Sequence, residues 1–111
     1  MKRIHYSGGS VLTGDNIAHS FALYAASLAI AGSADAVIIP VVKDGAFGTA
    51  EIVIGPASQL MVEDAGIEFD AEFDEAPYLA QLDERRGRLD SPVGVQPSAA
   101  GEVASSMIDD F

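Results

Sequence analysis

The chain is 111 residues long, contains no cysteine and carries a formal net charge of −11. This length corresponds to a single domain at most, and the absence of cysteine excludes disulfides and cysteine-based zinc sites. Residues 1–60 hold three basic and four acidic side chains, whereas residues 61–111 hold three basic and thirteen acidic ones. An electrostatic field of this sign repels nucleic acids and anionic membranes and attracts basic proteins. We therefore expect no binding to nucleic acid or to a membrane.

Residues 2–7 alternate between polar and apolar side chains, which predicts a short N-terminal strand. A turn at 8–10 follows, and the chain then continues extended to Thr13, a good N-cap for a helix that runs from Gly14 to about Ala31.

This helix is apolar on nearly every side, because Leu23 and Ile30 interrupt its thin polar strip. A helix of this kind is normally buried nearly all round. We expect the C-terminal half or a second copy of the chain to cover its second face.

Two apolar runs at 36–42 and 47–54 are separated by Lys43-Asp44-Gly45, a pattern that predicts a β-hairpin with a tight turn. Pro40 cannot donate a backbone hydrogen bond, so its strand is expected at a sheet edge or with a bulge. A further short strand is predicted at 59–63.

Between Glu63 and Glu75 there are seven acidic residues and no basic one, and residues 67–74 alternate strictly between apolar and acidic side chains. The favoured interpretation is an edge strand whose phenylalanines cover the helix. The alternative is an exposed amphipathic segment that binds a partner's sheet or groove. The residues concerned are Glu68, Phe69, Asp70, Glu72 and Phe73.

Residues 75–89 have acids early and arginines late, as in a short helix. The predicted organisation is a compact α+β core at 1–66, an acidic strand-like segment plus helix at 67–89, and a flexible tail at 90–111. The fold class is α+β, with a small, mostly antiparallel sheet against one long helix.

Three motifs come close to known sites without matching them. Gly9 and Gly14 have the spacing of a phosphate-binding loop, but Asp15 and Asn16 stand where that loop needs lysine and a hydroxyl. The acidic cluster lacks the glycine and the final glutamate of a calcium-binding EF-hand loop. The two histidines have no spacing that predicts a metal site. No metal or cofactor is therefore expected.

The segment KRIHYSGGSVLTGD, the alanine-rich helix after it and the later GPASQL segment resemble small uncharacterised proteins of high-GC bacteria. The resemblance covers about half of the chain (residues 1–60). It implies no activity and transfers no functional residue.

The sequence favours a non-enzymatic interaction protein, a homodimer whose acidic half contacts a basic partner. The alternative is a small enzyme or ligand-binding protein with a site at the glycine-rich turn 8–16, near Ser58. The candidate ligand-binding residues are His5, Tyr6, Thr13, Asp15 and His19. A cytoplasmic location is expected, because polar residues separate the basic start from the apolar run 21–31, which is too short to span a membrane.

Overall fold

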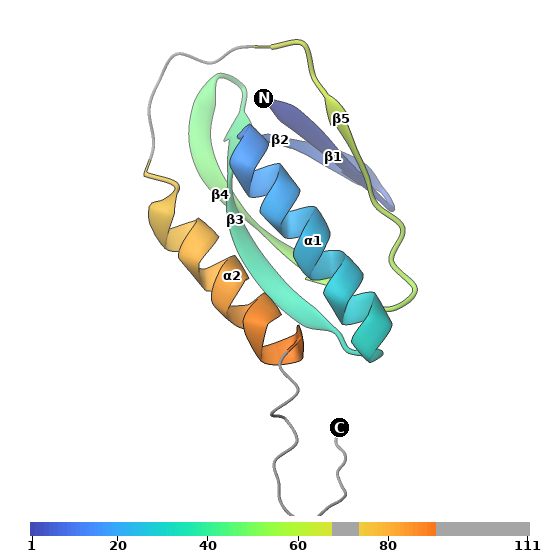
Figure 1. Ribbon diagram of the computed structural model, residues 1–111. Helices are drawn as coiled ribbons and strands as arrows, with labels where there is room; N and C mark the ends of the chain where they lie inside the picture. The colour runs from blue at the N-terminus through green and yellow to red at the C-terminus, as the bar shows by residue number, and fades with distance from the viewer. Residues whose placement is uncertain (68–73, 91–111) are drawn as a thin grey trace, which may run out of the picture.

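The structure of the protein is a computed structural model that describes residues 1–67 and 74–90. The described part contains a five-stranded sheet and two helices (Figure 1). In chain order the elements are β1 (Lys2–Tyr6), β2 (Gly9–Thr13), α1 (Asp15–Ala31), β3 (Asp35–Lys43), β4 (Ala46–Ile54), β5 (Met61–Asp64) and α2 (Ala76–Asp90).

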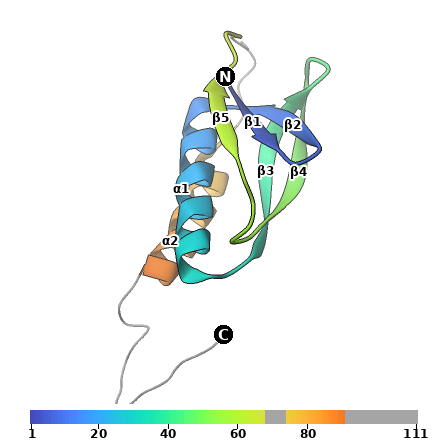
Figure 2. The same ribbon diagram turned by 90° about the vertical axis from the view of Figure 1, so that its right-hand side faces the viewer.

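The strands lie in the order β4-β3-β2-β1-β5, and every neighbouring pair is antiparallel. The hairpins β1–β2 and β3–β4 are joined by one register pair, Leu12 with Val42. Both helices cover the same face of the sheet, and within the described residues no helix lies on the other face (Figures 1 and 2). The predicted α+β class is confirmed.

The ends of α1 follow from local backbone chemistry. Asp15 in the first turn complements the positive end of the helix dipole. Gly32 adopts the left-handed conformation (φ 68°) that commonly ends a helix. The expectation that Thr13 caps the helix is wrong, since Gly14 occupies the N-cap position. Thr13 is buried instead, and its Oγ1 donates a hydrogen bond to the Pro40 carbonyl at 2.6 Å.

The hairpin β3–β4 forms as predicted. Its two strands keep a continuous register from Asp35–Ile54 to Lys43–Ala46. Asp44 (φ 53°) and Gly45 (φ 77°) supply the positive φ angles of the tight turn.

The expectation that Pro40 marks an edge strand or a bulge is wrong. β3 lies between β4 and β2, and its register with β4 has no bulge. The proline is tolerated because β2 pairs with β3 only at Val42, so no ladder with β2 is interrupted at position 40.

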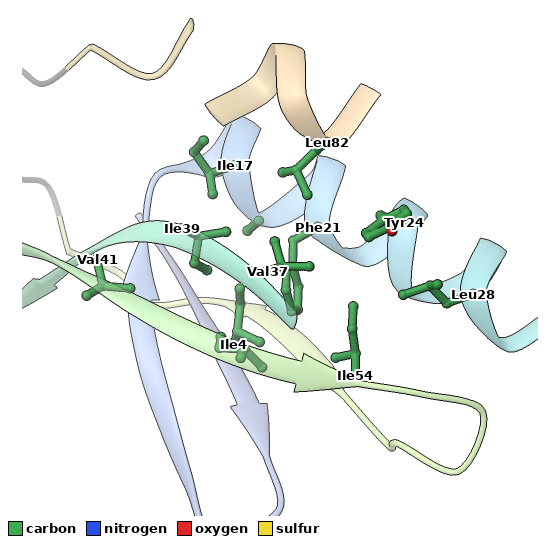
Figure 3. Close-up of a cluster of buried hydrophobic side chains, with 12 residues drawn as sticks. Ile4, Ile17, Phe21, Tyr24, Leu28, Val37, Ile39, Val41, Ile54 and Leu82 are labelled. Carbon is green, nitrogen blue, oxygen red and sulfur yellow. The ribbon is translucent and has the colours of Figure 1, made fainter. Parts of the chain in front are cut away.

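The core lies between the sheet and the helices (Figure 3). Phe21 of α1, Ile4 of β1 and Ile39 of β3 are fully buried there. Leu82 of α2 points into the same core, with 2% of its surface exposed (Figure 3). The second helix therefore supplies cover for α1.

The expectation that α1 is buried nearly all round is wrong for one strip of the helix. Leu23 is 39% exposed and Ile30 is 89% exposed. The sheet and α2 cover two sides of α1, and these residues lie on a side that neither element reaches. Single exposed apolar residues are common on protein surfaces, so this strip by itself indicates no site.

Candidate functional site

The helix-free face of the sheet is apolar over three of its strands. Side chains of β3 that alternate with buried Val37, Ile39 and Val41 point away from the helices. The register places residues of β2 and β4 beside them. We call this surface the apolar half-face, and it consists of Leu12, Ala36, Ile38, Pro40, Val42, Phe47 and Val53. Ala36, Ile38, Phe47 and Val53 are exposed, Leu12 and Val42 are half-buried, and Pro40 is buried. Within it Ile38 is 48% exposed and Val53 is 73% exposed.

The sequence of β3 explains why this surface exists. Seven consecutive apolar residues, 36–42, occupy the strand. Strands that are covered on both faces typically have such continuous runs, whereas a strand with one face in water usually alternates. Within the described residues, helices cover only one face of β3 (Figure 2). The even-numbered residues of the run are therefore apolar, as in a buried surface, although neither helix covers them.

The other half of the helix-free face is charged. Arg3 of β1 pairs in register with Glu63 of β5, and its neighbour His5 lies on the same side. The Nε2 atom of His5 is 2.6 Å from Oε1 of Glu63. The register row Phe47, Val42, Leu12, Arg3, Glu63 thus passes from apolar to charged across the sheet.

A cleft of about 300 Å³ follows the free edge of β4. It is lined by the consecutive residues 50–53 of β4, by Tyr6 and Ser7 after β1, and by 58–60 before β5. Because successive strand residues point to opposite faces, four consecutive lining residues place the cleft along the strand's edge. Its polar groups include the hydroxyls of Tyr6 and Ser58 and the carboxylate of Glu51.

Two local contacts fix the positions of Tyr6 and Ser58, which line this cleft. The Tyr6 ring lies against Gly9 across the β1–β2 hairpin, where a side chain on Gly9 would be 3.5 Å from the Tyr6 hydroxyl. The Ser58 Oγ accepts a hydrogen bond from the Gly55 N–H at 3.0 Å. This Ser58–Gly55 bond lies within the GPASQL segment.

A partly buried polar cluster joins α1, β3 and α2. The Tyr24 hydroxyl donates to Oδ2 of Asp35 at 2.5 Å, and Arg85 donates to the same oxygen at 2.8 Å. Burial, then the hydrogen bond and charge of Asp35, raise the pKa of Tyr24 to about 12. Burial also acts to raise the pKa of Asp35, but Tyr24, the Ala36 N–H and Arg85 together lower it below its usual value.

The hydrogen bonds from Tyr24 and Arg85 to Asp35 connect separate elements of the core. We therefore interpret the cluster as structural.

The candidate ligand-binding residues fall at separate places. Tyr6 lines the cleft, and with His5 it also lines a shallow groove beside it. Thr13 is buried at the opposite end of β2. Asp15 pairs with the Met1 amino group at 3.1 Å, and His19 is exposed on α1.

The glycine-rich turn is thus not the centre of the cleft. The sequence did not predict that Glu51 and Gln59 line the cleft. The GPASQL segment did point to this region, since its Ser58 was expected near the turn.

The residues predicted for partner binding, Glu68, Phe69, Asp70, Glu72 and Phe73, lie outside the described residues. Both interpretations of 67–74 therefore stay predictions. In residues 1–67 and 74–90 no group of three or more potential metal ligands is found. No helix in this part of the chain is long and apolar enough to cross a membrane.

Comparisons with known proteins identify no relative: no family model matches the chain, and neither a curated protein nor a solved structure is significantly similar to it. The function must therefore be argued from the surface itself.

Proposed function

We propose that the protein is a non-enzymatic interaction module of the cytoplasm whose docking surface is the apolar half-face. The observation that carries the proposal is the composition of β3, which is apolar on both faces although helices cover one. Apolar residues that gather on one exposed face of a chain often mark an interaction site.

The charges around this surface define the chemistry of the partner. Glu51 of β4 lies beside the apolar half-face, opposite Ile38, and Glu63 lies in the charged half of the same face. The whole chain carries a net charge of −11. The partner therefore has an apolar centre that packs on Ile38 and Val42, with basic residues around it that face these acids.

The test compares Ile38→Lys with the matched control Ile30→Lys. Lysine at position 38 lies opposite Glu51, so the pairing of β3 and β4 is kept while a charge enters the centre of the apolar half-face. Ile30 is 89% exposed on α1, and the same substitution there leaves the sheet untouched.

Each full-length protein is immobilised and exposed to a lysate of the source organism, and the captured proteins are quantified by mass spectrometry. We expect a basic protein to be retained by the wild type and by Ile30→Lys. Its capture by Ile38→Lys is expected to fall about tenfold, because docking would have to remove water from the added charge and would place it against the partner's basic residues. Equal capture by all three proteins would refute the apolar half-face as the docking surface.

A further inference from the structure

The cleft beside β4 contains a single charged side chain, that of Glu51. No basic residue lines the cleft. The ion pairs found in residues 1–67 and 74–90 do not include Glu51, and its register neighbour on β3 is the apolar Ile38. Glu51 is exposed. Its carboxylate is therefore available to a cation from outside the chain, with which it would form charge-assisted hydrogen bonds.

The other polar groups of the cleft can accept hydrogen bonds from such a cation. Gln59 has an amide oxygen, and Tyr6 and Ser58 have hydroxyl oxygens. The Ser58 Oγ accepts the Gly55 N–H, which uses one of its two lone pairs and leaves the other. A primary ammonium group carries three donors and no acceptor, so it matches this set of groups. An anion would meet the Glu51 carboxylate and no compensating positive charge.

The remaining walls of the cleft are largely apolar. Ile52 is buried, and Ala50 and Leu60 are half-buried. The volume of about 300 Å³ lies at the lower end of the range for ligand pockets, about 300–1,000 Å³. A cleft of this size, with apolar walls and one carboxylate, suits a cation that is carried on a short apolar chain.

We propose that this cleft binds a primary ammonium group on a short alkyl chain, with Glu51 as its charge partner. The alkyl chain lies against Ile52 and Leu60, and the ammonium group donates to the Glu51 carboxylate and the Gln59 side-chain oxygen. Such a group occurs in free amines and at the end of a lysine side chain. Val53 lines the cleft and belongs to the apolar half-face, so the cleft adjoins the surface on which we place the partner. The lysine source rests on the proposed function, whereas the binding site itself does not.

The experiment titrates the full chain with n-butylammonium, which has the atoms of a lysine side chain, and follows the backbone amide shifts by NMR. The comparison probes are n-butanol and butyrate, whose chains end in a neutral and a negative group. We expect saturable shifts at the residues that line the cleft, with a dissociation constant in the millimolar range. Both comparison probes are expected to bind about tenfold more weakly, because neither brings a positive charge to Glu51.

Two pairs of variants separate the cleft from the general negative charge of the protein. Glu51→Gln keeps the shape of the side chain, removes its charge and is expected to weaken n-butylammonium binding about tenfold. Glu84→Gln makes the same change on exposed α2 and is expected to change nothing. Gln59→Glu adds a carboxylate to the cleft and is expected to tighten binding about threefold. Gln81→Glu, with the same change of charge on α2, is its control.

Equal weakening by Glu51→Gln and Glu84→Gln would overturn the proposal. Equal binding of n-butylammonium and n-butanol would do the same, and so would amide shifts that spread over the acidic surface and spare the cleft. A loss of fold in Glu51→Gln would be visible in its amide spectrum. In that case Gln59→Glu, which tests a gain of affinity, decides the question.

Competition distinguishes the two sources of the ammonium group. A saturating concentration of n-butylammonium is added to the wild-type capture experiment, with sodium chloride at the same concentration as the control. Release of the basic protein by the amine alone assigns the cleft to a lysine of the partner. Retention of the basic protein, with the cleft occupied in the titration, assigns it to a free amine. Failure of the titration leaves the Ile38→Lys test of the apolar half-face untouched, so the two proposals fail separately.

Discussion

At the residue scale, the cluster of Tyr24, Asp35 and Arg85 couples the stability of the protein to pH. The pKa of Tyr24 rises from 10.0 to about 12 on folding. A folded-state pKa above the unfolded one means that the protonated hydroxyl is stabilised by the fold. This contribution is complete below pH 10 and is lost as the pH rises from 10 to about 12.

The first prediction concerns this tyrosine. Urea unfolding of the wild type is expected to show falling stability between pH 10 and about pH 12. Tyr24→Phe is expected to be less stable at neutral pH, since Asp35 loses a donor, and to lose less stability in that alkaline interval. Tyrosinate absorbance checks the assignment, because the substitution removes one late-titrating group of the three tyrosines. An unchanged alkaline profile in the variant would contradict it.

No sequence pattern indicated this cluster. Asp35 and Arg85 are 50 residues apart. No periodic pattern in a sequence predicts which charged residues pair at such a separation. The same holds for the bond between Thr13 and Pro40, 27 residues apart, which directed Thr13 inward instead of onto the helix end. Capping rules predict that Thr13 bonds to the backbone at the start of the helix that follows it. In the folded protein Thr13 bonds to the Pro40 carbonyl instead.

At the element scale, α2 belongs to the core. Leu82 is 2% exposed and packs with the residues that α1 and β3 bury. Leu82→Ala is expected to lower the free energy of unfolding by about 2–3 kcal/mol, the usual effect of removing a fully buried leucine side chain. Gln81→Ala, on the exposed side of the same helix, is the control and is expected to have almost no effect. Chemical denaturation measures both, and equal stabilities would mean that α2 does not contribute to the core.

The elements themselves were largely predictable. The Asp-Gly turn, the two apolar runs and the acid-to-arginine gradient of α2 are local signals, and each element formed within a residue or two of its predicted bounds. The position of β3 inside the sheet was not predictable, because Pro40 argues for an edge. β2 pairs with β3 at a single register position, Leu12 with Val42, so Pro40 interrupts no pairing there. Only the assembled sheet shows this.

At the scale of the whole molecule, the net charge of −11 limits the choice of partners. Phosphate backbones are recognised through positive charge, so the full chain is expected to show no binding to duplex DNA or RNA even at low ionic strength. Fluorescence anisotropy with labelled duplexes measures this, with a basic protein as positive control. Binding that weakens as salt is added would contradict the expectation and would point to a local basic surface.

The sequence by itself determined the α+β class, the helices and hairpins, and the acidity of the chain, because each depends on composition or on contacts between near neighbours. Only the tertiary structure decided which apolar residues are covered. The run 36–42 is uniform in sequence, but in the structure Val37, Ile39 and Val41 are buried under the helices, whereas Ala36 and Ile38 on the other face are exposed. The free edge of β4 and the cleft beside it arise from strand order, a long-range property that no local pattern contains.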